Sequence, residues 1–185
     1  METLSHLQKR LPSSHLDGRT LDGGIKYLAE LFSAYFRENR GKARFHGEPH
    51  DLRGILRQLV VIGNFLHIDV GTAVRRKYRD YCPRCFYKPC RCWNSPLRSA
   101  YKARMGRLPK ERTIIEMQSM LNEVFPHRHT LAEEVQHVRD EIVELLLAVE
   151  RQNRGSMEEE IADVFARLAR VANTLGISLD EQRPL

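Results

Sequence analysis

The stretch that decides the fold covers residues 130–175 and reads TLAEEVQHVRDEIVELLLAVERQNRGSMEEEIADVFARLARVANTL. Apolar residues recur in it at steps of three and four, the spacing of an amphipathic helix. Thr130 and Glu133 have the spacing of a capping box, and the polar residues 153–155 indicate a turn in which Gly155 ends a helix. The stretch therefore predicts helices over 130–152 and 157–175 that can lie antiparallel.

Four acidic residues stand in two pairs on these helices, Glu141 with Glu144 and Glu160 with Asp163. Residues three apart share a helix face, so each pair points the same way. Four facing carboxylates repel and raise one another's pKa, and a divalent cation removes that cost. Oxygen ligands favour Mg²⁺ or Mn²⁺ over zinc. Solvent-facing acids are the alternative, but these four border the apolar stripes.

Similar periodicity extends over most of the remaining chain. Residues 1–20 show no clear period, and no segment alternates like a β-strand, so the fold class is all-α. Further helices are predicted over 21–39, 51–66, 70–78 and 113–125, with Asp51 as an N-cap and with Gly41 and Gly176 as helix ends.

An internal repeat links the two halves. Residues 59–68 (LVVIGNFLHI) and 168–177 (LARVANTLGI) share a leucine, an asparagine, a second leucine and an isoleucine at matching positions. At a shifted offset, the Asn-Arg-Gly of 39–41 matches that of 153–155. Both matches occur in the same order, which predicts a duplicated helical hairpin.

Four cysteines fall within one short segment, Cys82, Cys85, Cys90 and Cys92, which is not predicted to be helical. Thiolates at this spacing in a loop predict a structural Cys₄ zinc site, although Cys90-x-Cys92 is tighter than usual. Free or redox-active thiols are the alternative. A closed site of four ligands leaves no position for catalysis, so its expected role is to stiffen the junction between the halves.

Charge is distributed unevenly along the chain. The net charge is +6, yet residues 75–112 hold 13 Lys/Arg against two acids, and residues 133–163 hold 10 Asp/Glu against three Arg. No apolar run approaches the roughly 18 residues of a membrane span, and the first residues lack the pattern of a signal peptide. We expect a cytoplasmic protein without a membrane partner. Basic and aromatic residues interleave around the cysteines, so nucleic acid is a possible partner that we do not favour.

The two acidic pairs, within DEIVELL (140–146) and EEIADVF (159–165) and followed by ANTLGI (172–177), resemble MazG-type all-α nucleoside triphosphate pyrophosphohydrolases. The resemblance covers about residues 114–181. It implies Mg²⁺-dependent attack of water on a nucleotide, releasing pyrophosphate and a monophosphate, with Glu141, Glu144, Glu160 and Asp163 as metal ligands. It also implies a homodimer or a higher homo-oligomer.

The N-terminal half resembles the same family in degenerate form, through GNFLHIDV (63–70), AVRRKY (73–78) and the Cys-Pro-x-Cys that follows. On the repeat, Tyr27 replaces Glu141 and Gly54 replaces Asp163, while Glu30 and Asp51 keep an acid. This half is therefore expected to be a structural partner, a built-in mimic of a second subunit. The expected domains are residues 1–81, a knuckle and basic linker over 82–112, and residues 113–185.

The family usually continues past its last helix with a basic segment, whereas residues 180–185 read DEQRPL. Either the activity is lost, or basic residues from elsewhere contact the substrate, with Arg75, Arg76 and Lys77 of the N-terminal half as candidates. Arg167, one helical turn after Asp163, is a further phosphate candidate, with a surface arginine as the alternative. The predicted function is a Mg²⁺-dependent nucleotide pyrophosphohydrolase. The alternatives are a non-catalytic nucleotide- or nucleic-acid-binding regulatory protein and a phosphoribosyl-ATP pyrophosphohydrolase. The sequence does not identify the nucleotide.

Overall fold

The computed structural model describes residues 2–11, 20–38, 49–92, 108–126 and 129–180, without the side chains of 49–51. Within these ranges the secondary structure is helical, apart from an isolated bridge between Thr3 and Thr113. The all-α prediction is confirmed. The helices are α1 (Leu4–Arg10), α2 (Leu21–Glu38), α3 (Pro49–Phe65), α4 (Val70–Lys77), α5 (Ile114–Val124), α6 (Leu131–Glu150) and α7 (Arg154–Leu175).

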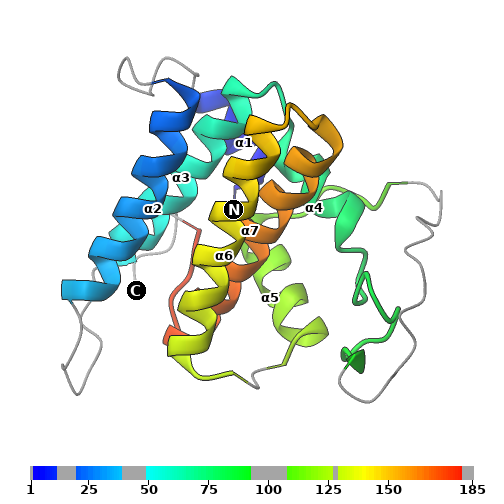
Figure 1. Ribbon diagram of the computed structural model, residues 1–185. Coiled ribbons are helices and arrows are strands. Elements are labelled where there is room, and N and C mark those ends of the chain that lie inside the picture. The colour runs from blue at the N-terminus through cyan, green and yellow to red at the C-terminus, as the bar shows by residue number, and fades with distance from the viewer. Residues whose placement is uncertain (1, 12–19, 39–48, 93–107, 127–128, 181–185) are drawn as a thin grey trace.

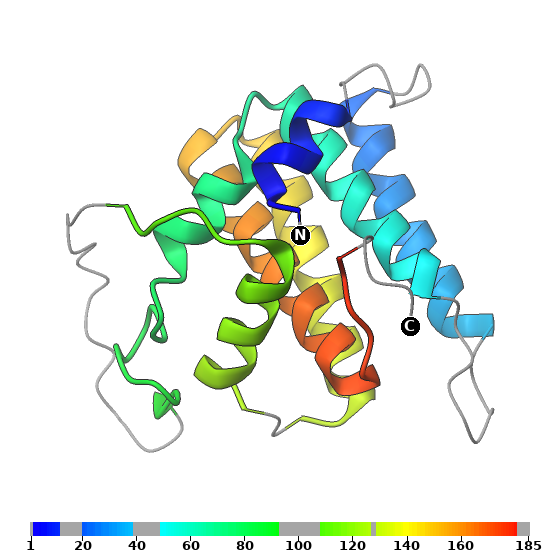
Figure 2. The ribbon, with the colours of Figure 1, turned by 180° about the vertical axis from the view of Figure 1, so that it is seen from behind.

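Two helical hairpins form the centre of the molecule. α2 packs on α3, α6 packs on α7, and the hairpins join through contacts of α2 with α6 and of α3 with α7 (Figure 1). The shorter helices α4 and α5 lie against α7, and α1 lies against α3 and α4 (Figure 2). No helix within the described ranges is long and apolar enough to cross a membrane.

α7 is the central helix because neighbours cover it on several sides. Its apolar stripe is fully buried and consists of Ile161, Val164, Leu168 and Val171. Alanines between them are buried as well, and their small side chains let α3, α4 and α5 approach. A polar residue on this helix therefore either faces an opening between neighbours or needs a partner inside the protein.

The ends of α6 and α7 follow local chemistry. Thr130 and Glu133 form the predicted capping box at the start of α6, and Gly176, with a φ of 69°, ends α7 as predicted. The prediction that Gly155 ends a helix is wrong. The chain turns at Gln152, whose φ is 52°, and the side chain of Asn153 accepts a hydrogen bond from the Ser156 amide, which starts α7 before Gly155.

Three boundaries in the N-terminal half differ from prediction or cannot be compared. α1 lies within residues 1–20, where the sequence shows no period. The period is not visible because the seven residues of this helix include only two buried leucines, Leu4 and Leu7. α3 begins at Pro49, so the prediction of Asp51 as the N-cap is wrong. Proline suits a first helical turn, since that turn needs no hydrogen bond from its amide. Gly41 and most of the basic linker, residues 93–107, lie outside the described residues.

The same hydrogen-bonded clamp occurs once in each half. Gln118 on α5 donates to the carbonyl oxygen of Ile177 (2.7 Å) and accepts from the amide of Leu179 (3.0 Å). Gln8 on α1 makes the corresponding bonds to Ile68 (2.7 Å) and Val70 (2.9 Å). Asn173 and Asn64, paired in the sequence repeat, donate to the backbone oxygens of Gln118 and Gln8. A duplicated unit would produce this correspondence, and the duplication itself stays a prediction.

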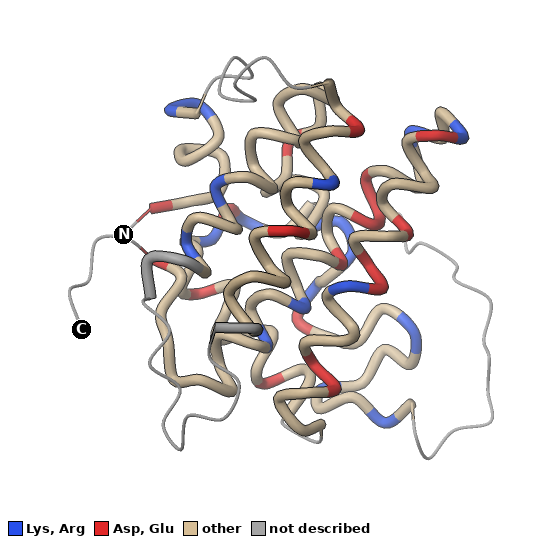
Figure 3. Tube along the Cα trace, turned by 60° about the vertical axis from the view of Figure 1, so that its left-hand side comes forward, with Lys and Arg blue, Asp and Glu red and all other residues tan. Residues whose placement is uncertain are grey.

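The contact that matters most for the site is α4 against α7. α4 belongs to the N-terminal half, and its last turn carries Arg75, Arg76 and Lys77. It packs against α7, and Lys77 in its last turn pairs with Asp163 of the second acidic pair. Acidic positions along the α6–α7 hairpin are interspersed with basic ones, and basic positions from neighbouring elements approach them (Figure 3).

Candidate metal centre and adjoining cavity

Three of the four predicted metal ligands converge. Glu141 and Glu144 extend from α6 and Glu160 from α7, and one carboxylate oxygen of each lies within 4.8 Å of the others. The i, i+3 spacing places the first two on one face of α6, and the packing of α6 on α7 brings the third opposite. Glu144 is exposed, while Glu141 and Glu160 are half-buried, so the group is open to solvent on one side.

The electrostatics of this cluster favour a cation. Burial raises the pKa of Glu160 to about 7, and the charges of Asp163, Glu144 and Glu141 add to the rise while Lys77 opposes it. Burial and Asp163 likewise raise the pKa of Glu141, against the opposing effect of Arg167. The Oε2 atom of Glu160 is buried and has no hydrogen-bond partner among the described residues. An orphaned buried oxygen among crowded carboxylates fits a divalent-cation site, because the ion satisfies the oxygen and removes the repulsion.

Asp163, the fourth predicted ligand, does not join this group of three. Its carboxylate pairs with the ammonium of Lys77 and accepts a 2.5 Å hydrogen bond from the hydroxyl of Tyr78. The side chains of Asp163 and Lys77 are 18% and 16% exposed, so solvent screens this pair only partly. Burial, followed by the charge of Asp163, raises the pKa of Tyr78, which stays a hydroxyl donor.

The predicted basic residues divide into three placements. Lys77 reaches the acidic site, and Arg167 lies beside it, 3.1 Å from Glu141. Arg76 pairs with Glu158 at 3.0 Å, on the exposed border of the site. Arg75 instead donates to backbone oxygens of Gly71 and Pro109 and to the hydroxyl of Thr72. The structure thus brings two of the four predicted basic residues to the carboxylates.

A buried ion pair adjoins the site, and its arginine was not among the predicted site residues. Arg170 on α7 pairs with Glu134 on α6, and their side chains are 10% and 1% exposed. The guanidinium also lies over the ring of Phe125, 5.6 Å from its centroid. A signal was available, since Arg170 follows Arg167 by three residues and shares its helix face. Its burial depends on α5 packing, which local spacing does not reveal.

The four cysteines lie together, with one sulfur of each within 4.8 Å of the others. Sγ of Cys82 is 3.6 Å from that of Cys92, and Sγ of Cys85 is 3.9 Å from that of Cys90. The amide of Arg91 donates to Sγ of Cys85 at 3.3 Å. Amide-to-sulfur hydrogen bonds of this kind stabilise thiolates, the form that binds metals. The group fits a tetrahedral Cys₄ site.

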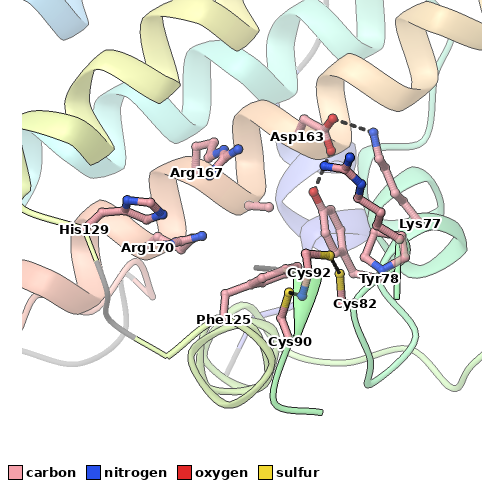
Figure 4. Close-up of a pocket in the computed structure, with 13 residues that line it drawn as sticks. Lys77, Tyr78, Cys82, Cys90, Cys92, Phe125, His129, Asp163, Arg167 and Arg170 are labelled. Atoms are coloured by element: carbon pink, nitrogen blue, oxygen red, sulfur yellow. Dashed lines mark hydrogen bonds and ion pairs between the residues drawn. The ribbon is translucent and has the colours of Figure 1, made fainter. Parts of the chain in front are cut away.

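A cavity of about 440 Å³ separates the cysteine cluster from α7 (Figure 4). One wall consists of Cys82, Cys90 and Cys92. The opposite wall is α7, and Tyr78 and Phe125 lie between the two walls. The full lining is Lys77, Tyr78, Cys82, Pro83, Arg84, Cys90, Cys92, Phe125, His129, Asp163, Ala166, Arg167 and Arg170.

The corresponding positions of the N-terminal half form no equivalent acidic group among the described side chains. Glu30 is exposed on α2, and Tyr27 and Gly54 offer no carboxylate. The side chain of Asp51 lies outside the described residues. The described part of this half instead contributes Lys77 and Tyr78 to the site of the other half.

Residues 129–182 match the family model described as MazG nucleotide pyrophosphohydrolase domain. The match covers α6, α7 and all four acids, so the resemblance of this segment to the family is confirmed. It indicates a function of the nucleotide pyrophosphohydrolase type. No curated protein and no solved structure matches the chain.

Proposed function

We propose that the protein hydrolyses a nucleoside or deoxynucleoside triphosphate, or a related nucleotide, to a monophosphate and pyrophosphate. The observation that carries the proposal is the convergence of Glu141, Glu144 and Glu160 within the segment that matches the pyrophosphohydrolase family. One oxygen of Glu160 is buried without a hydrogen-bond partner among the described residues. These three carboxylates would hold Mg²⁺ or Mn²⁺. The bound ion would neutralise phosphate charge and lower the pKa of a coordinated water.

Residues around the cluster would supply the cations that contact the phosphates. Asp163 holds the ammonium of Lys77 beside the carboxylates, in a position to contact a phosphate oxygen. The hydroxyl of Tyr78 fixes the other oxygen of Asp163. Arg167 provides a second cation next to Glu141. The site thus combines carboxylates from the C-terminal half with a cation from the N-terminal half.

The cysteine cluster would bind zinc in a structural role. Its four sulfurs are close enough to share one ion, and a site with four protein ligands leaves no position for water or substrate. The amide of Cys90 donates to the backbone oxygen of Val124 at 2.7 Å. This bond ties the cluster to the end of α5 and so to the core of the molecule.

Pyrophosphate release tests the proposed reaction. The protein is incubated with Mg²⁺ and each common NTP and dNTP, and Glu144→Gln is compared with Glu159→Gln. Glu159 carries the same charge on the same hairpin, but it is exposed and lies outside the cluster. Glu144→Gln should lose more than about 100-fold in rate, since even outer-shell partners of a metal cost about 10–100-fold. Absence of turnover, or an equal loss in both variants, would contradict the proposal.

A second function is favoured by one surface feature. Phe86 and Tyr87 on the cysteine loop are 40% and 53% exposed, and the guanidinium of Arg91 lies 5.0 Å from the centroid of the Tyr87 ring. Exposed aromatics beside cations bind single-stranded nucleic acid by stacking and phosphate contacts. A non-catalytic protein of this kind would show salt-sensitive gel shifts that Tyr87→Ala weakens and Glu144→Gln leaves unchanged.

A further inference from the structure

The cavity between the cysteine cluster and α7 carries an inference beyond the site of hydrolysis. Its described lining holds four cations, Lys77, Arg84, Arg167 and Arg170, against one carboxylate, Asp163. Arginine binds phosphate oxygens through paired hydrogen bonds, and the three arginines of this lining supply donors of that kind.

The cations on the α7 side are held in place. Arg167 is anchored by Glu141 and Arg170 by Glu134, while Lys77 is anchored by Asp163. Preorganised donors lose less conformational freedom on binding a ligand. Arg84 also lines the cavity and belongs to the cysteine loop, between Cys82 and Cys85. An anion in the cavity would therefore meet cations from α4, from α7 and from the cysteine loop.

The aromatic side chains of the cavity are already engaged. Tyr78 and Phe125 pack edge to face, with ring centroids 5.9 Å apart, and the guanidinium of Arg170 covers the Phe125 ring. Tyr78 is buried, and its hydroxyl is bonded to Asp163. These rings offer poor surfaces for stacking a nucleotide base, which argues against the nucleoside as the occupant.

The cavity adjoins the candidate metal centre through two residues that border both. Asp163 lines the cavity and lies one helical turn from Glu160. Arg167 lines the cavity and pairs with Glu141. An elongated anion held by the carboxylate cluster at one end can therefore reach the cations of the cavity at the other.

We propose that this cavity is the subsite for the pyrophosphate end of the nucleotide, and that the cysteine loop forms its outer wall with Arg84 as a phosphate contact. The proposal rests on the proposed function for the identity of the nucleotide, but binding of pyrophosphate can be measured without turnover. It gives the cysteine cluster a second role, because the cluster fixes the position of Arg84 between two of its ligands.

The test is calorimetric titration of the full-length protein with inorganic pyrophosphate and with AMP, each in the presence of Mg²⁺. Arg84→Ala is compared with Arg91→Ala, which removes the same charge from the same loop at a residue outside the cavity lining. Arg84→Lys tests whether charge alone suffices. Zinc content is measured in all three variants, so that a collapsed loop is recognised.

Arg84→Ala should weaken pyrophosphate binding about tenfold or more, the loss expected for a charge-assisted hydrogen bond. Arg84→Lys should recover part of this affinity. AMP binding in Arg84→Ala, and pyrophosphate binding in Arg91→Ala, should change less than about twofold, since neither removes such a bond.

The subsite would be overturned by equal weakening in Arg84→Ala and Arg91→Ala, or by loss of AMP binding with pyrophosphate binding unchanged. If Arg84→Ala releases pyrophosphate from triphosphates normally and binds it normally, the subsite is wrong and the proposed function stands. If pyrophosphate binding depends on Arg84 but no nucleotide is hydrolysed, the proposed function is wrong and the subsite stands.

Discussion

Replacing Glu160 by glutamine should stabilise the metal-free protein at alkaline pH while removing its response to Mg²⁺. The pKa of Glu160 in the folded protein is about 7, raised from an ordinary 4.5 by burial and by neighbouring carboxylates. A carboxyl group with a raised folded pKa contributes stability that is fully present below about 4.5 and is lost as the pH rises through about 7. Above that pH, Glu160 is charged in the folded protein, where burial and the neighbouring carboxylates destabilise the charge.

The size of this effect follows from the pKa difference. Each pKa unit is worth about 1.4 kcal/mol, so the rise from 4.5 to about 7 corresponds to at most about 3 kcal/mol. Glu160 is only half-buried, and solvent screening reduces the interaction, so we expect about 1–2 kcal/mol. A bound divalent cation would reverse the penalty, because it satisfies the charged oxygen.

The assay is urea unfolding at pH 5 and at pH 8, with and without Mg²⁺. Without metal, the wild type should lose about 1–2 kcal/mol more than Glu160→Gln between these pH values. With Mg²⁺, the wild type should gain stability at pH 8 and little at pH 5, where protons compete for the carboxylates, and the variant should gain little at either. A variant less stable than the wild type at pH 8 without metal would refute the reasoning.

Three further predictions concern the surroundings of the site. Gln118→Ala should cost about 2–4 kcal/mol in urea unfolding, because it leaves the buried amide of Leu179 without its partner. A loss below about 1 kcal/mol would show that water replaces the hydrogen bonds that Gln118 makes to the backbone. Lys77→Met should reduce the rate of pyrophosphate release at least about tenfold, the value of one charge-assisted contact. An unchanged rate would show that Lys77 of the N-terminal half does not contribute to the site. Cys85→Ser should lower zinc content from one ion per chain to near zero by metal analysis, and full retention of zinc would contradict Cys₄ ligation.

The long helices could be predicted because their signals are local. The α6–α7 stretch carries its own periodicity, and its capping box depends on residues three apart. α1 could not be found in this way, because seven residues with two buried leucines are too few to establish a period. The prediction that Gly155 ends a helix failed because the side chain of Asn153 caps α7, so that Gly155 lies inside this helix.

The candidate site was predictable to the extent that it depends on helix faces. The spacing of Glu141, Glu144 and Glu160 was sufficient to place them together once their helices pack. The partners of Asp163 were not predictable from spacing, because Lys77 and Tyr78 precede it by 86 and 85 residues. The contact arises from the packing of α4 on α7. The homodimer and the boundaries of the three predicted domains stay predictions.

Direct titration of a divalent cation tests the central claim most closely. Mn²⁺ binding to the metal-free protein, followed by electron paramagnetic resonance, should reveal a site that Glu144→Gln weakens strongly and that Mg²⁺ displaces. The matched variant Glu159→Gln should bind as the wild type does, since Glu159 lies outside the cluster. Equal Mn²⁺ affinity in the wild type and Glu144→Gln would contradict the account.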